Sequence, residues 1–124
     1  MRVALALSLM LAAAPLRAEW VKLGETEAAV HYVDAAAIRG DGDLRRVWAM
    51  QDMRNASPDG VRSIRALQEY DCAQDRFRYL SVSAHSRPMA GGQVLAAHDL
   101  VDEWTGRPPG TRPSAIEKIV CAPI

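Results

Sequence analysis

The sequence lacks the motifs of several large enzyme classes. Its eight glycines form neither a P-loop nor a G-x-G-x-x-G turn, so no nucleotide site is indicated. No serine lies in a G-x-S-x-G elbow, and no C-x-x-C pair is present. The sequence therefore offers no motif for these enzyme classes.

An excess of charge of either sign is also missing. The chain has 15 basic and 15 acidic residues and a formal net charge of zero at pH 7. Such a balance provides no general attraction to nucleic acid or to anionic lipid. Apart from Lys22 and Lys118, every basic residue is arginine. This usage is typical of a GC-rich genome, and the alternative is an arginine surface that binds carboxylates or phosphates in bidentate fashion.

No apolar run is long enough to span a bilayer as a helix, which takes ~20 residues. The apolar segment 3–14 follows Arg2 and ends shortly before Ala18. A charged start, a short apolar stretch and a small residue at the end predict a secretory signal peptide at residues 1–18. We therefore expect an exported chain, periplasmic or secreted, whose residues 19–124 form one domain. Neither cysteine lies at the expected junction between signal peptide and domain, so no lipid anchor is expected on the new N-terminus.

Only two cysteines are present, Cys72 and Cys121. In an exported chain two cysteines most simply form one disulfide. The bond would close a loop of about fifty residues and add ~4 kcal/mol of stability in the chain-entropy model. The alternative is a pair of reactive or metal-binding thiols, but no histidine lies at a ligand spacing from either cysteine.

Turn-forming residues divide the chain into segments of strand length. Glycine, proline, aspartate and asparagine gather at residues 40–43, 55–60, 88–92 and 107–110. The patterns between them predict six strands. The expected strands span residues 20–23, 28–33, 44–54, 61–72, 76–86 and 93–98, and Asp34 is expected to cap a helical turn at 35–38.

The last part of the chain changes to a helical period. Ser114 with Glu117 forms the capping pattern S-x-x-E, and Pro113 suits a helix start. Apolar residues then recur on one helical face, at Ile116, Ile119 and Val120. We predict a short helix that ends near Cys121 and packs on the sheet. The whole pattern predicts an α+β domain: an antiparallel sheet of about six strands with a short C-terminal helix.

Three residues are candidates for a haem or metal site. His85 and His98 flank the last expected hairpin together with Met89. If the hairpin brings them together at its open end, imidazole and thioether ligands would suit haem iron or a soft metal. The simpler interpretation is that the histidines are surface or hydrogen-bonded residues, and then no cofactor is expected.

A small hydrolase with a dispersed site is a second alternative. Ser86 adjoins His85, but neighbours on a strand point to opposite faces. A serine, a histidine and an acid can still assemble from distant segments. Nothing in the sequence selects such a set.

A series of ordered landmarks carries a family resemblance. It includes the segment Glu69-Tyr70-Asp71-Cys72, two cysteines and an N-terminal signal. The further landmarks are Tyr32-Val33-Asp34, Ile38, Val47-Trp48, Ser86 through Gly91-Gly92-Gln93-Val94, Trp104, Pro109-Gly110-Thr111 and Val120-Cys121. In this order they resemble the surface-adhesin protein E family of Gram-negative bacteria, over about residues 20–121.

The resemblance implies an antiparallel sheet of about six strands, a C-terminal helix and a disulfide between Cys72 and Cys121. It also implies a binding activity, because the best-known member binds host vitronectin, laminin and plasminogen. That member has been linked to haem and can dimerise, which makes a homodimer a further expectation.

We therefore expect an exported, non-enzymatic binding protein of the cell envelope. Its partner would be an extracellular-matrix or envelope protein, not a nucleic acid. The expected binding surface is a stripe of arginines on neighbouring strands, which could engage acidic segments or sulfated polymers. These residues are Arg62, Arg65, Arg76 and Arg78. The alternative for the same residues is a solvated strand face with acidic neighbours.

Overall fold

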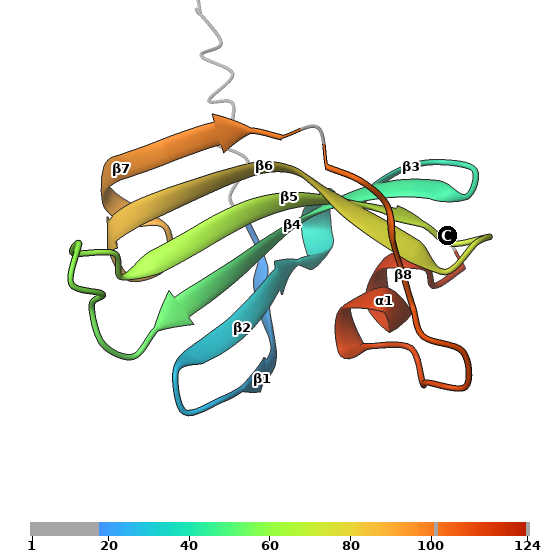
Figure 1. Cartoon of the computed structure of the whole chain (residues 1–124), viewed down its shortest axis with the longest axis horizontal. Coiled ribbons are helices and arrows are strands. Elements are labelled where there is room, and N and C mark those ends of the chain that lie inside the picture. Colours follow the sequence, from blue (N-terminus) through green and yellow to red (C-terminus); the bar gives the residue numbers. More distant parts are fainter. Residues whose placement is uncertain (1–17, 101, 124) are drawn as a thin grey trace, which may run out of the picture.

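The computed structural model describes residues 18–100 and 102–123, so residues 1–17 of the expected signal peptide lie outside the described residues. In the described part, eight strands form one sheet and a short helix lies against it (Figure 1). The elements in chain order are β1 (Trp20–Glu25), β2 (Ala29–Asp34), η1 (Ala35–Ala37), β3 (Arg39–Asp41), β4 (Leu44–Met53), β5 (Ser63–Asp71), β6 (Arg76–Arg87), β7 (Gly91–Asp99), β8 (Thr105–Gly106) and α1 (Ala115–Val120).

The strand order is β1-β2-β4-β5-β6-β7, with β3 paired to β4 and β8 paired to β6. Every pairing is antiparallel. The sheet curves around α1 as a half-barrel (Figure 1). The predicted fold class is confirmed. We call the face that α1 covers the inner face and the opposite one the outer face.

The six predicted strands are present with small shifts at their ends, and Asp34 caps the short helical turn η1 through its side chain. Two short strands were not predicted. β3 overlaps the turn predicted at residues 40–43. Gly42 takes a positive φ of 63° and turns the chain back, so that β3 pairs with β4. β8 has only two residues, so its pairing with β6 leaves no periodic pattern in the sequence.

The helix α1 forms as predicted. Ser114 is its N-cap and accepts a hydrogen bond from the backbone N–H of Glu117 at 3.2 Å. Ile116 and Ile119 pack on the inner face of the sheet. The buried cluster beneath them consists of Val33, Val47, Tyr70 and Val120. The core therefore joins three strands to the last turn of the helix.

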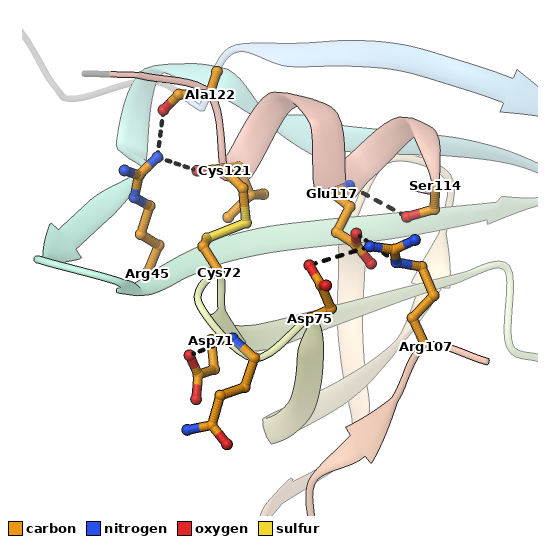
Figure 2. Close-up of a disulfide and its surroundings, with 11 residues drawn as sticks. Arg45, Asp71, Cys72, Asp75, Arg107, Ser114, Glu117, Cys121 and Ala122 are labelled. Carbon is orange, nitrogen blue, oxygen red and sulfur yellow. Dashed lines mark hydrogen bonds and ion pairs between the residues drawn. A yellow bond between two sulfur atoms is a disulfide. The ribbon is translucent and has the colours of Figure 1, made fainter. Parts of the chain in front are cut away.

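Two side chains fasten α1 besides the apolar contacts. Arg45 donates from Nη1 to the carbonyl of Val120 at 2.9 Å and to that of Ala122, so a cation meets the unpaired carbonyls at the helix end. Arg107 pairs with Asp75 at 3.1 Å and with Glu117 at 3.3 Å (Figure 2). The helix is thus tied to β4 and to the turn after β5.

The predicted disulfide is confirmed. Cys72 follows β5 and Cys121 is the C-cap of α1, and their sulfur atoms are bonded with Cα atoms 5.6 Å apart (Figure 2). The alternative of free or metal-binding thiols is therefore excluded in this state. The bond joins residues separated by 49 positions and holds the end of the chain against the sheet.

Replacing both cysteines by serine, Cys72→Ser with Cys121→Ser, should lower the free energy of unfolding by about 4 kcal/mol, because the unfolded chain regains the entropy of the open loop. Urea denaturation at pH 7 measures this change. A reducing agent should cause the same loss in the unaltered protein and none in the double variant. Equal stability of the oxidised protein and the double variant would contradict the prediction.

Candidate functional site

Strand register places charged side chains in a row on the outer face. Arg46 on β4, Glu69 on β5 and Arg78 on β6 are paired in register. Side chains alternate between faces along a strand. Because the adjacent residues Val47 and Tyr70 belong to the core under α1, these three side chains lie on the outer face.

Glu69 lies beneath the two guanidinium groups. Nε of Arg46 donates to Oε2 at 3.0 Å, while Nε and Nη2 of Arg78 donate to Oε1 at 3.0 and 2.7 Å. The Glu69 side chain is 5% exposed, whereas those of Arg46 and Arg78 are 58% and 32% exposed. Burial opposes ionisation of Glu69, but the hydrogen bonds from both arginines outweigh it and lower the pKa of the carboxyl. The cluster thus presents guanidinium to solvent.

The ring of Trp104 lies against the guanidinium groups of Arg76 and Arg78. Its ring centroid is 4.6 Å from the guanidinium carbon of Arg76 and 4.3 Å from that of Arg78. These are cation–π distances. Arg76 also pairs with the buried carboxylate of Asp71 at 3.0 Å. Trp104 is half-buried, so the residue is partly accessible beside the arginines.

A second pair of the same kind lies farther along the sheet. The guanidinium carbon of Arg65 is 3.7 Å from the ring centroid of Trp48. Burial lowers the pKa of Arg65, and the carboxylate of Asp34 opposes that shift. Trp48 is half-buried, like Trp104. We call the set the arginine–tryptophan face; it consists of Arg46, Arg65, Arg76, Arg78, Trp48 and Trp104.

The four arginines predicted as one stripe do not form a single patch. Arg76 and Arg78 lie together under Trp104. Arg65 is paired with Ser83 and lies four residues along β5 from Glu69, roughly 13 Å of strand. Arg62 precedes β5, and its backbone N–H donates to the carbonyl of His85. The prediction failed at this point because the hairpin register pairs Arg76 and Arg78 with acidic residues.

The predicted arginine stripe did not include three members of this face, Arg46, Trp48 and Trp104. Alternation along β4 places Arg46 and Trp48 opposite the core residue Val47, and that signal was available in the sequence. The contact of Trp104 with Arg76 and Arg78 was not, because it depends on the path of the chain between β7 and β8.

The structure does not bring the three candidates for a haem or metal site together. His85 is paired with Val94 and His98 with Val82, and alternation along β6 puts these positions on opposite faces. Met89 lies in the turn between β6 and β7 and is 40% exposed. Among the residues that the structure describes, no group of three or more His, Cys, Asp or Glu is arranged to hold a metal ion. The expected convergence at the hairpin end is therefore wrong.

A serine and a histidine do meet on β6. Ser83 Oγ and His85 Nε2 are 2.8 Å apart, because residues two apart on a strand share a face. Burial lowers the pKa of His85, and the positive charge of Arg65 adds to the shift. Within residues 18–100 and 102–123, no carboxylate is hydrogen-bonded to this imidazole. Without an acid to orient the ring, the pair does not support the dispersed hydrolase site.

The neighbouring Ser63 has a structural use. Its Oγ donates to the carbonyl of Arg87 at 2.7 Å and accepts from the N–H of Ala90 at 2.9 Å. Asp52 accepts from the N–H of Met89 at 3.1 Å. Met89 and Ala90 both have positive φ, 59° and 57°, which is unfavourable for residues with a Cβ. The two polar side chains hold this turn in place.

Comparison with known proteins decides the family. A protein-family model described as Surface-adhesin protein E matches residues 20–122. The chain belongs to the surface-adhesin protein E family. No curated protein matches the chain.

Solved structures agree with this assignment at the level of the fold. The crystal structure of protein E from non-typeable Haemophilus influenzae is similar to the chain with a TM-score of 0.65 and 17% identity, over 86% of this chain and 78% of that one. Crystal form II of Haemophilus influenzae protein E gives a TM-score of 0.64 and 17% identity, over 86% and 90% of the two chains. The protein E fold is therefore shared at low sequence identity.

The described residues contain no helix with the length and apolar character needed to cross a membrane.

Glu69→Gln should destabilise the fold by about 2 kcal/mol at pH 7, because charge-assisted hydrogen bonds to both arginines are lost. The lowered pKa of Glu69 means that its contribution is complete above pH 4.5 and declines as the pH falls through the folded-state value. Urea denaturation of both proteins at pH 7 and pH 3 checks this. A difference in stability that stays constant between the two pH values would refute the role of the ionised carboxylate.

The ring of His85 should titrate below the ordinary value of about 6.5. Its contribution to stability is present above that value and is lost as the pH falls through the folded-state pKa. Arg65→Gln should move the midpoint upward, but not fully to the ordinary value, because burial is the larger cause. NMR titration of the ring resonances measures both midpoints, with Arg39→Gln on β3 as the matched control. A midpoint at or above 6.5 in the unaltered protein would contradict the prediction.

Proposed function

We propose that this protein is an exported, non-enzymatic binding protein that recognises acidic segments of extracellular-matrix or envelope proteins. The arginine–tryptophan face is the surface that makes the contact. The observation that carries the proposal is the arrangement around Glu69, in which one buried carboxylate holds two partly exposed guanidinium groups toward solvent.

This arrangement leaves hydrogen-bond donors for a partner. Among the hydrogen bonds of the described residues, Arg46 uses only Nε to bind Glu69. Its two terminal nitrogens can therefore bind a partner carboxylate as a fork. Because Glu69 orients the group from below, less side-chain freedom is lost on binding.

The tryptophans supply the apolar part of the surface. Trp104 and Trp48 each lie against an arginine and are half-buried. Tryptophan and arginine are enriched among the residues that dominate binding energy in protein interfaces. A rigid aromatic ring beside an oriented guanidinium suits a segment that alternates acidic and apolar side chains.

The family supports a binding role over catalysis. Its members are described as surface adhesins, and the chain matches the family over most of its length. A surface or envelope location agrees with the signal peptide expected at residues 1–18. The exported protein would meet its partner outside the cytoplasm.

Arg46→Glu and Trp104→Ala should each weaken binding tenfold or more, because one reverses the charge of an exposed donor and the other removes an aromatic anchor. Biolayer interferometry with immobilised vitronectin, laminin or plasminogen measures the dissociation constants. Affinity should also fall as salt is raised from 50 to 300 mM.

Arg87→Glu is the matched control, since Arg87 is exposed at the far end of β6. Circular dichroism of each variant verifies the fold. Equal affinity of Arg46→Glu, Trp104→Ala and the unaltered protein for a ligand that does bind would disprove the assigned surface. Absence of binding to all three immobilised proteins would remove host proteins of this kind as the proposed partners.

Location is tested separately by treating intact cells with protease. Digestion on intact cells indicates display at the surface and access to host proteins. Protection that ends when the outer membrane is opened indicates a periplasmic protein, and the partner would then be an envelope protein.

A further inference from the structure

A groove lies on the inner face of the sheet, beside the area that α1 covers. Its volume is about 410 Å³, within the roughly 300–1,000 Å³ typical of small-molecule sites. The groove is separate from the arginine–tryptophan face, because the two lie on opposite sides of the sheet. Its apolar lining includes Leu23, Ala49, Ile64, Ala66, Val82 and Ile116.

The groove exists because the helix is short. α1 has six residues and is ~9 Å long, whereas β4 has ten residues and is ~33 Å long. Figure 1 shows α1 under the end of the sheet near β3 and β8, away from the β6–β7 turn. The rest of the inner face is left without a cover from this helix.

Small side chains form the floor of the groove. Ala49, Ala66 and Val82 are paired in register across β4, β5 and β6. Larger side chains rise on both sides of this row, with Ile64 on one side and Ile116 of α1 on the other. The result is a trough that runs across the strands and has one isoleucine side chain on each side.

Among the described residues that line the groove, none carries a carboxylate, ammonium or guanidinium group. This is notable in a chain with 24% charged residues. A charged ligand would lose its hydration there without gaining a partner of opposite charge. The lining therefore favours an uncharged occupant.

Polar side chains at the groove still offer hydrogen bonds. Gln51 and His31 lie on one side of the floor, and Gln68 and Tyr79 on the other. Oε1 of Gln68 accepts from the hydroxyl of Tyr70 at 3.1 Å, so its amide nitrogen remains as the donor. These groups suit the hydroxyl or ester oxygens of a ligand that lies between the two sides of the trough.

We propose that the groove binds a neutral amphiphile with a single acyl chain, such as a monoacylglycerol. The chain lies over the alanine floor between Ile64 and Ile116. The uncharged head group meets the glutamine side chains at the edge of the trough. A fatty acid carboxylate would lose its hydration in this lining without gaining a cationic partner, and a second copy of this chain would cover the groove as protein concentration rises. The experiment separates both cases from binding of a neutral amphiphile.

The test is a fluorescence titration of the exported protein with the neutral probe N-phenyl-1-naphthylamine. Saturable binding is expected, and 1-monolauroylglycerol should displace the probe at least tenfold more effectively than laurate. Ala66→Leu should weaken binding of the probe at least tenfold, because the larger leucine side chain fills the space above the floor. Ala97→Leu, the same change at an exposed position of β7, should have no effect.

A second variant keeps the test decisive if Ala66→Leu does not fold. Gln51 is exposed on β4, so Gln51→Glu should leave the fold intact. It should weaken the binding of monolauroylglycerol, because it places a negative charge at the groove. Gln93→Glu on β7 is its matched control.

Several results would overturn the proposal. These are absence of saturable probe binding, equal displacement by laurate and monolauroylglycerol, or equal affinity in the groove variants and their controls. Loss of probe binding with rising protein concentration would assign the groove to a second copy instead. Arg46→Glu should leave probe binding unchanged, so failure of the protein-binding function and failure of this proposal are distinguishable.

Discussion

The inner side of the molecule depends on holding a six-residue helix against a sheet. A helix this short is not stable alone, since isolated helices below ~12–15 residues are marginal in water. Apolar packing of Val120 on the sheet, the Arg45 contact with the last carbonyls and the Cys72–Cys121 bond act on the same turn. The disulfide is the only covalent bond in this group, and it keeps the end of α1 close to the sheet so that the weaker contacts can form.

The outer side depends on one buried carboxylate. Glu69 on β5 binds guanidinium groups from β4 and β6, so a single residue orders the charges of its two neighbouring strands. The same principle recurs at Asp71, which holds Arg76 beside Trp104. The acidic residues thus orient the arginines and still leave their guanidinium groups accessible to solvent.

The sequence predicted those parts of the fold that local rules determine. Turn residues bounded the six long strands, and Ser114 with Glu117 marked the helix start. Register was not predictable, because it depends on how whole strands align. For this reason Arg65 and Arg78 were expected to be neighbours, and His85 and His98 to converge. Two-residue strands such as β8 and the position of Trp104 depend on tertiary contacts that leave no periodic trace.

The position of α1 also links surface shape to the redox state of the compartment. Ile116 forms one wall of the inner groove, and the helix that carries it is closed by the disulfide. In a reducing cytosol the chain would lack this bond, and that wall would depend on weak contacts alone. The disulfide-held form of this wall therefore requires an oxidising environment, so protein made with and without the bond are different reagents for any binding study.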